Sequence, residues 1–408
     1  MLTGRRLRIR FSGGGFYNGA VLERLARRNY FRDEGQIDHM RVSKSVIGEL
    51  EQEAVRQVLE RGFLGTGTET QAFERELAAY IGGEVQVVCT NTGTAALQLA
   101  LQACDIGAGD EVLTPSLTFV ATFQAISATG ATPVACEVQE STGLLDLEDA
   151  QRRITARTKA IMPVHYASAM GDLDAVYDFG ETHALRVVED AAHAFGCTYK
   201  ERRIGSFSEV SCFSFDGIKN ITSGEGGAIV SHNPEIIRRI QDARLLGVEK
   251  DTEKRYQRQR SWDFDVIEQG WRYHMSDIMA AIGRVQLRRF EPEFRPRRVA
   301  LARAYRESLA SLPDVRFFEA EIGAVVPHIQ PVRILEGKRD RVRQALLDDG
   351  IETGIHYKPN HLLSKYGGGK VSLPVTERLY SEILTLPLHP DLSGEDVETV
   401  VDVVKRAL

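Results

Sequence analysis

The chain has 408 residues, of which 43% are hydrophobic, and a formal net charge of -6. This length is too great for one small core, so two domains, or one large and one smaller domain, are expected. The charge gives no sign of a surface for nucleic acid or membranes, and no apolar run is long enough to span a bilayer. We therefore expect a globular protein without a nucleic-acid or membrane partner.

The first 40 residues differ from the rest of the chain. They are rich in Arg, contain a Gly triplet and show no clear periodicity, which predicts a loosely ordered extension over residues 1–40. The basic start lacks the apolar stretch and the cleavage site of a signal peptide. Five cysteines without a CxxC pair favour a reduced setting, and we expect a cytoplasmic protein. These cysteines stand at positions 89, 104, 136, 197 and 212.

Periodic sequence begins at about Arg41. Apolar residues recur at helical intervals over 48–62, where the pattern stops at Gly62, and again over 70–83. Beyond these two segments, short apolar runs alternate with helical stretches. The runs lie at 85–90, 110–116, 132–138, 159–166 and 185–190. This alternation predicts βαβ units and a mostly parallel sheet that is buried on both faces.

The character of the sequence changes again near its C-terminal third. Residues 288–312 form a long, charged, helical stretch, which we interpret as the link into a second, smaller domain. The chain ends with an amphipathic helix over 393–408 that Ser393 can cap. The predicted organisation is a large domain over 41–290 and a small domain over 291–408.

Candidate site residues follow the apolar runs, because ligands in open α/β sheets bind beyond the carboxyl ends of the strands. Gly93 and Thr94 open a helix after 85–90, where free N–H groups and the helix dipole favour an anion. An ordinary helix cap is the alternative. Phe119 would start the next helix. It could cover a flat ring, or it could be a core residue, the commoner fate of a lone Phe.

Asp190 ends the run at 185–190, and His193 follows it closely. A carboxylate just past a buried strand needs a partner. A protonated ring nitrogen would serve, and so would the N-terminus of a helix. His193 could contact a ligand or fill space. A metal site that includes His165 is not supported by any close ligand spacing, so no metal is expected.

Lys219 comes after an alternating, strand-like stretch and before the glycines at 224, 226 and 227. Surface exposure is the usual fate of a lysine, but the flanks here are apolar and the glycines permit tight turns. A desolvated lysine has a lowered pKa and can act as a nucleophile or form a Schiff base. An anion site, an aromatic ring, a carboxylate and such a lysine together describe a site for pyridoxal phosphate (PLP).

From about Arg41 onward the chain resembles the DegT/StrS family of PLP-dependent sugar aminotransferases, within the fold-type-I group. The motifs are FLGTG, NTGTAAL, TPSLTFVAT, PVHY, VVEDAAHAFG, FSFDGIKNITSGEGG, MSDIMAAIGRVQL and TGIHYKP. The resemblance implies an α/β fold with a mostly parallel seven-stranded sheet between helices and a smaller C-terminal α+β domain. It also implies a homodimer with a shared active site.

Position by position, the resemblance implies three catalytic residues. Lys219 matches the lysine that holds PLP as an aldimine, Asp190 matches the carboxylate that faces the ring nitrogen, and His193 lies close to the ring. The remaining matches are contacts to the cofactor. Gly93, Thr94 and Ser214 are implied at the phosphate, and Phe119 on the ring. Arg272 stands where many members have an Asn that reaches the phosphate of the neighbouring subunit's cofactor, and its forked side chain could bind phosphate.

The implied reaction moves an amino group, with L-glutamate as the expected donor, to a keto group of a nucleotide-linked deoxy sugar. The product would serve surface polysaccharide, lipopolysaccharide or other amino-sugar biosynthesis. Related sugar dehydratases carry His in place of the lysine, so Lys219 favours transamination. Two alternatives remain: an aminotransferase for a non-nucleotide keto sugar, sugar acid or cyclitol, and a PLP-binding regulator without turnover. The second is less favoured, because no DNA-binding module is attached.

Overall fold

The computed structural model describes residues 39–248, 264–320 and 323–408. The predicted extension over 1–40 therefore lies almost wholly outside the described residues. From Arg41 to Leu408 the chain forms one compact unit by its internal contacts. The predicted division of this unit near residue 290 stays a prediction.

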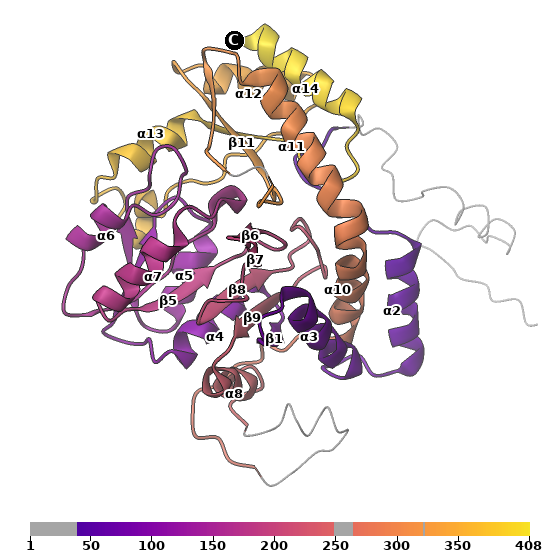
Figure 1. Ribbon diagram of the computed structural model, residues 1–408, viewed down its shortest axis with the longest axis vertical. Helices are drawn as coiled ribbons and strands as arrows, with labels where there is room; N and C mark the ends of the chain where they lie inside the picture. The colour runs from indigo at the N-terminus through magenta and orange to yellow at the C-terminus, as the bar shows by residue number, and fades with distance from the viewer. Residues whose placement is uncertain (1–38, 249–263, 321–322) are drawn as a thin grey trace, which may run out of the picture. The chain divides into compact units, whose positions relative to one another are not determined.

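Seven strands form the central sheet in the spatial order β1-β9-β8-β5-β4-β2-β3. Figure 1 labels β1, β9, β8 and β5 of this sheet. Strand β9 runs antiparallel to both of its neighbours, β1 and β8, and every other neighbouring pair is parallel. The predicted mostly parallel sheet is confirmed. Its strands are β1 (Gln86–Thr90), β2 (Glu111–Pro115), β3 (Thr132–Cys136), β4 (Thr158–Ile161), β5 (Arg186–Asp190), β8 (Val210–Ser214) and β9 (Gly227–Ser231).

Both faces of this sheet are buried. Successive side chains of a strand point to opposite faces. Phe213 of β8 accordingly packs in one core with Phe73, and its neighbour Cys212 packs in a second core with Leu99. All residues of β8 and β9 are buried. Burial on both sides explains why these strands appear in the sequence as short apolar runs.

Helices cover the two faces of the sheet. Helix α10 packs on α2 and α3, and α4 packs on α5 and α8. Helix α2 ends at the predicted position, because Gly62 adopts the left-handed conformation with φ 69°. The helices are α2 (Glu49–Arg61), α3 (Thr68–Ile81), α4 (Gly93–Ala103), α5 (Val120–Ala128), α6 (Leu147–Arg152), α7 (Leu173–Thr182), α8 (Pro234–Ala243) and α10 (Asp277–Arg289). Short elements between them are η1 (Tyr166–Ser168), β6 (Thr198–Tyr199) and β7 (Arg202–Arg203).

One long helical run leads from the sheet into the C-terminal part (Figure 1). Helix α10 continues through the π-helical segment η2 (Phe290–Phe294) into α11 (Arg295–Leu309). A second, antiparallel sheet follows, in the order β10 (Val315–Phe317), β11 (Gln330–Ile334), β12 (Ile383–Leu386). Its helical segments are α12 (Arg339–Asp348), η3 (Asn360–Leu362), η4 (Ser364–Tyr366), α13 (Pro374–Glu382) and α14 (Gly394–Ala407).

The last helix begins at the predicted cap. Ser393 Oγ accepts a hydrogen bond of 3.1 Å from the Asp396 N–H, and the Asp396 side chain accepts one from the Ser393 N–H. The reciprocal pair satisfies two donors at the helix start. Helices together with an antiparallel sheet confirm the α+β character expected of the C-terminal part. Across the described ranges, no helix is long and apolar enough to cross a membrane.

Candidate active site

Lys219 lies in a turn beyond the carboxyl end of β8. The strand ends at Ser214, so the lysine is five residues further along the chain than the strand itself. Its N–H donates to the Asp216 carbonyl at 3.1 Å, and its own carbonyl accepts from Arg298 at 3.4 Å. Hydrogen bonds to the N–H and to the carbonyl of Lys219 therefore fix the direction in which its side chain leaves the turn.

The environment of Lys219 makes its amine easier to deprotonate. Burial lowers its pKa to about 8, and the negative charges of Asp190 and Asp216 oppose this shift. The amine nitrogen lies 3.3 Å from Nε2 of His328. A lysine with this pKa has a much larger fraction of neutral, nucleophilic amine near neutral pH than an exposed lysine has.

Asp190 is the last residue of β5 and is almost completely buried. Its Oδ2 accepts from the Thr122 hydroxyl at 2.8 Å, and its Oδ1 accepts from the Ala192 N–H at 3.2 Å. The segment after it is a turn, so Asp190 does not cap an α-helix. Burial raises its pKa, whereas the charges of Lys219 and His165 act to lower it. The site thus holds a carboxylate that a positively charged partner would stabilise.

His193 contacts two other segments of the chain through its ring nitrogens. Nδ1 accepts from the Ala167 N–H at 3.3 Å, and Nε2 lies 3.0 Å from the Tyr357 hydroxyl. Burial, followed by the charge of Lys219, moves its pKa well below the ordinary value, so the ring is neutral. Because Nδ1 is an acceptor here, the ring proton is on Nε2 and is donated to Tyr357.

The start of α4 is packed tightly against the end of β8 and the start of β9. A β-carbon on residue 93 would come within 2.8 Å of the Ser214 β-carbon, and one on residue 227 within 2.5 Å of the Thr92 carbonyl oxygen. Thr92 Oγ1 accepts from the Ala95 N–H at 3.0 Å and so caps the helix. The two interpretations of this segment, an anion site and an ordinary helix cap, are therefore compatible. Thr92 supplies the cap, and the N–H groups of Gly93 and Thr94, at the start of the helix, have no partner within it.

Phe119 lies at the N-cap position of α5. Of the two alternatives for this residue, the core position is excluded, since the side chain is 54% exposed. A contact with a flat ring stays a prediction. Its ring centroid is 5.5 Å from that of Tyr357, with the two planes tilted by 47°. The C-terminal part of the chain thus supplies an aromatic partner for Phe119 in a tilted arrangement.

The glycines after Lys219 serve different purposes. Gly224 has φ +81°, so the turn needs a glycine there. Gly226 and Gly227 do not adopt a positive φ. Their side-chain positions are instead blocked, by Ser223 and Met275 for Gly226 and by the α4 start for Gly227. The prediction that all three glycines permit turns is therefore only partly correct, because two of them permit close packing.

Arg272 is exposed and lies in an extended segment whose backbone pairs with Leu245. Within the described part of the chain, no hydrogen bond or ion pair joins its side chain to Lys219 or to the start of α4. The segment nevertheless runs past that helix start, because the Tyr273 carbonyl accepts from the Asn91 N–H at 2.7 Å. A contact from Arg272 to the cofactor of a neighbouring subunit stays a prediction.

Several residues from the C-terminal part reach the site without having been assigned a role from the sequence. These are His328, His356 and Tyr357, each of which is titratable and close enough to Lys219 or His193 to interact with it. Two of them belong to the motif TGIHYKP, so the resemblance carried a signal for them. His328 precedes an ordinary buried strand, and no local pattern distinguishes it.

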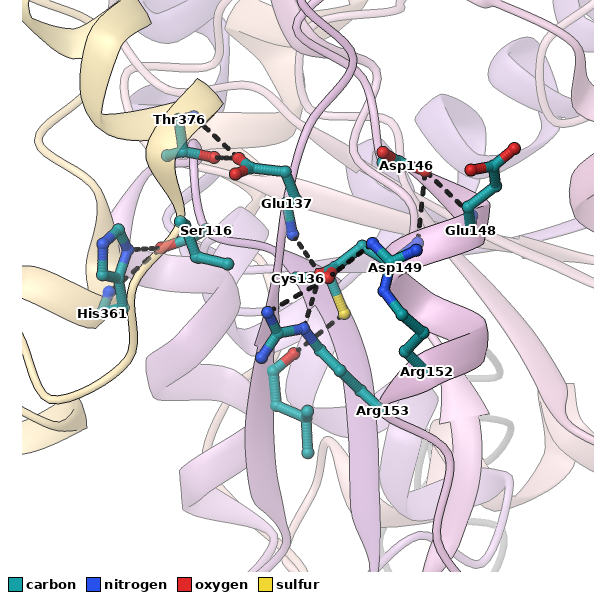
Figure 2. A network of polar contacts seen from close by, with 12 residues as sticks. Ser116, Cys136, Glu137, Asp146, Glu148, Asp149, Arg152, Arg153, His361 and Thr376 are labelled. Atoms are coloured by element: carbon teal, nitrogen blue, oxygen red, sulfur yellow. Dashed lines mark hydrogen bonds and ion pairs between the residues drawn. The ribbon is translucent and has the colours of Figure 1, made fainter.

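A network of polar contacts holds this C-terminal segment to the ends of β2 and β3 (Figure 2). Ser116 Oγ lies 2.7 Å from His361 Nδ1 and also accepts from the His361 N–H at 3.0 Å. Asn360 donates to the Thr118 carbonyl at 2.8 Å. Glu137 accepts from the N–H of Thr376 at 2.7 Å, at the start of α13. The loop that carries Phe119 and the segment that carries Tyr357 are thereby joined.

Metal ligands and disulfides do not contribute to the site as described. His165 Nε2 pairs with Glu189 Oε2 at 2.7 Å. In residues 39–248, 264–320 and 323–408, no three side chains of His, Cys, Asp or Glu gather as a metal site would require. The five cysteines are free and buried, and burial raises the thiol pKa of each.

Comparison with known proteins places this fold in one class. The aminotransferase TlmJ from Streptoalloteichus hindustanus superimposes with a TM-score of 0.83 at 35% identity, over 90% of this chain and 98% of that one. Spr1654 from Streptococcus pneumoniae, in its PLP form, gives a TM-score of 0.82 at 30% identity, over 91% and 99% of the two chains. Spr1654 also has a PMP form. The expected fold type I is confirmed, and the class is that of PLP-dependent aminotransferases.

The family follows from the sequence comparisons. Residues 45–405 match the DegT/DnrJ/EryC1/StrS aminotransferase family. The spore coat polysaccharide biosynthesis protein SpsC of Bacillus subtilis (strain 168) is 36% identical over 391 residues, covering 93% of this chain and 98% of that protein. The chain belongs to this family of sugar aminotransferases.

Proposed function

We propose that this aminotransferase uses PLP bound to Lys219 to move an amino group from L-glutamate to a keto group of a nucleotide-linked deoxy sugar. The product would be an amino sugar for a surface polysaccharide, for lipopolysaccharide or for another amino-sugar pathway. One observation carries the proposal. The Lys219 amine, whose pKa is lowered to about 8, lies near the Asp190 carboxylate at the carboxyl edge of a parallel sheet.

Besides Lys219, the residues present fit PLP at two points. The start of α4, with Gly93, Thr94 and the Ser214 hydroxyl, suits a phosphate, because helix N-termini attract anions. The blocked side-chain positions at residues 93 and 227 show that the backbone must approach closely there. Asp190 suits a protonated ring nitrogen, and such a cation would oppose the effect of burial on its pKa.

When bound, PLP would provide an electron-accepting ring for the carbanion formed at the α-carbon of the amino donor. Asp190 would keep a proton on the ring nitrogen. The Lys219 amine, neutral above pH 8, would take the proton from the α-carbon and return it at the other end of the reacting system. His193, neutral and fixed by Ala167 and Tyr357, would contact the ring, and Phe119 would cover it.

We further propose that two copies of the chain form the active site, with Arg272 of one copy binding the phosphate in the other. The exposure of Arg272 and the path of its segment past the start of α4 support this assignment. A mixing experiment tests it. Lys219→Ala and Arg272→Ala should each be nearly inactive alone. Mixed dimers should regain activity, since one of their two sites would have both residues intact. No recovery after verified subunit exchange would contradict the shared site.

The visible absorption spectrum tests the cofactor and the donor. The purified protein, supplied with PLP, should show the band of a lysine-bound cofactor, and L-glutamate should convert it to the PMP-type spectrum. Lys219→Ala should lack the lysine-bound band and the conversion. A variant that completed transamination at the normal rate would remove Lys219 from the mechanism.

The keto substrate requires a separate panel. The PMP form should be offered nucleotide-linked keto sugars, free keto sugars, keto sugar acids and keto cyclitols. The proposal expects the PLP spectrum to return with a nucleotide-linked member only. Its return with a free sugar, acid or cyclitol would replace the substrate class, and no return with any member would leave a PLP-binding protein without sugar turnover.

A further inference from the structure

We propose that His328 is a positioning residue of the reaction: its Nε2 accepts a hydrogen bond from the Lys219 amine and fixes the direction of the amine lone pair. The inference rests on the proposed role of Lys219. It concerns a residue that precedes β11 and is separated from the lysine by 109 positions in the sequence.

The geometry places the two groups in direct contact. Lys219 Nζ and His328 Nε2 are 3.3 Å apart, and the histidine side chain is buried. The His328 ring also packs on the His193 ring, with centroids 4.5 Å apart and planes inclined by 54°. His328 thus touches both the amine and a residue that contacts the predicted ring site.

The surrounding chain holds His328 firmly in this position. Its N–H donates to Ser168 Oγ at 3.0 Å, and that hydroxyl donates to the His193 carbonyl at 2.5 Å. The buried guanidinium of Arg298 donates to the His328 carbonyl at 3.2 Å and to the Lys219 carbonyl at 3.4 Å. One arginine therefore holds the backbone of both partners at the point where their side chains meet.

Protonation decides which partner donates. Burial and the charge of Lys219 move the pKa of His328 well below its ordinary value, so its ring is neutral. A lysine ammonium has only donors. Below pH 8 the ring must therefore accept through Nε2, which places the ring proton on Nδ1. Nδ1 is buried and has no hydrogen-bond partner among the described residues.

The other charged groups near the amine do not replace this contact. Asp190 and Asp216 act on Lys219 through their charges, with no hydrogen bond to Nζ in the described part of the chain. His193 and His356 have lowered pKa values and are neutral. His328 is thus the group that takes one N–H of the amine. A neutral amine held in this way keeps its lone pair free, which suits proton transfer at a fixed carbon.

Three substitutions of His328 separate positioning from packing. His328→Gln places an amide oxygen near the position of Nε2, whereas His328→Asn places one near Nδ1 and cannot reach Lys219. His328→Leu fills space without any acceptor. Circular dichroism and thermal unfolding would first establish that each variant folds. If the Leu variant does not fold, the Gln and Asn pair still decides the question.

The first readout is the pKa of the Lys219 amine in the apoenzyme. It is measured by the pH dependence of acetylation with acetic anhydride, quantified on the peptide that contains Lys219. Loss of an acceptor disfavours the ammonium form, so His328→Asn and His328→Leu should lower this pKa by about one unit. His328→Gln should restore a value near that of the unchanged protein. Equal pKa values in all four proteins would overturn the proposal.

The second readout is the kinetic pattern of the PLP-loaded enzyme. His328→Asn and His328→Leu should lower kcat for the half-reaction with L-glutamate by about tenfold or more, with KM little changed, because orientation and not binding is lost. His328→Gln should recover most of kcat. A loss of the same size in the Gln variant would assign His328 to packing. Because Lys219→Ala tests the lysine itself, failure here would leave the proposed function standing.

Discussion

Gly93 and Ser214 approach so closely that a β-carbon on residue 93 would lie 2.8 Å from the β-carbon of the serine and 3.0 Å from its hydroxyl oxygen. Gly93 begins α4, the helix that follows β1, whereas Ser214 is the last residue of β8. Their contact brings helix N–H groups and a hydroxyl to one point. This is the point at which the cofactor phosphate is proposed to bind.

Gly93→Ala should therefore weaken PLP binding. The added methyl group must displace Ser214 or the helix start, and we expect the affinity of the apoenzyme for PLP to fall by about tenfold or more. Titration of the apoenzyme with PLP, followed by absorbance, measures the effect. Gly107→Ala is the matched control, because a β-carbon there meets nothing closer than the Thr129 carbonyl oxygen at 3.8 Å. Equal affinities for both variants would contradict the phosphate site.

Lys219→Met should change how the stability of the apoenzyme depends on pH. The lysine pKa falls from 10.5 to about 8 on folding, so between these values the unfolded chain holds more protons than the folded one. Stability contributed by this group therefore rises with pH across that window, with a slope of at most about 1.4 kcal/mol per pH unit.

Urea unfolding of the apoenzyme and of Lys219→Met, at several values between pH 8 and pH 10.5, isolates this contribution. The difference in free energy of unfolding between the two proteins should shift in favour of the unchanged protein as the pH rises. A constant difference would show that the amine is not desolvated in the folded state. Other groups that titrate in this range cancel, because both proteins contain them.

Tyr357→Phe should destabilise the protein and reduce its activity. The neutral His193 ring donates its Nε2 proton to the Tyr357 hydroxyl, so removal of that hydroxyl leaves a buried donor without a partner. The expected cost is about 1–3 kcal/mol of unfolding free energy. Thermal and urea unfolding, together with kcat, measure the change. Tyr199→Phe, which loses a hydroxyl at the surface, should stay close to the unchanged protein.

Glu137→Gln should loosen the start of α13. The carboxylate accepts from the Val375 N–H at 3.0 Å. It also accepts from the N–H of Thr376 at 2.7 Å and from the Thr376 hydroxyl (Figure 2). An amide would present a donor where an acceptor is needed. We expect a loss of about 1–3 kcal/mol, because a buried negative charge at a helix N-terminus is replaced by a mismatched group.

The surface variant Glu140→Gln provides the comparison for this network. Glu140 pairs with Arg333 and Arg378 but is half exposed, and such pairs contribute little. Urea unfolding should therefore distinguish the two Gln variants clearly. Equal losses would show that the contact of Glu137 with α13 contributes no more than a surface ion pair.

Much of the fold was predictable because the sheet is buried on both faces. Buried parallel strands produce short apolar runs, and the residues directly after them stand at one edge of the sheet. This reasoning located Asp190 and the start of α4 from local sequence alone. Lys219 was predicted on the same basis, although it lies in a turn several residues beyond the strand.

The contribution of the C-terminal part was not predictable in the same way. His328 and Tyr357 meet the site through contacts that span 109 and 164 positions of sequence. A local pattern of apolar residues does not predict such long-range contacts, since they depend on how the two sheets are joined. The choice between a ring contact and a core position for Phe119 was left open by the local sequence for a related reason. Its partner Tyr357 comes from the distant segment, and the side chain remains half exposed rather than entering the core.

The continuous run from α10 to α11 has a mechanical consequence. Its middle, Phe290–Phe294, is a π-helical turn that contains Pro292, and Pro296 follows at the start of α11. Neither proline can donate a backbone hydrogen bond, so the rod is least resistant to bending at this joint. Arg298 lies just beyond this π-helical turn and donates a hydrogen bond to the backbone carbonyl of Lys219. Bending of this helical run would therefore shift the turn that carries Lys219, so a load on the C-terminal sheet would change the position of the amine.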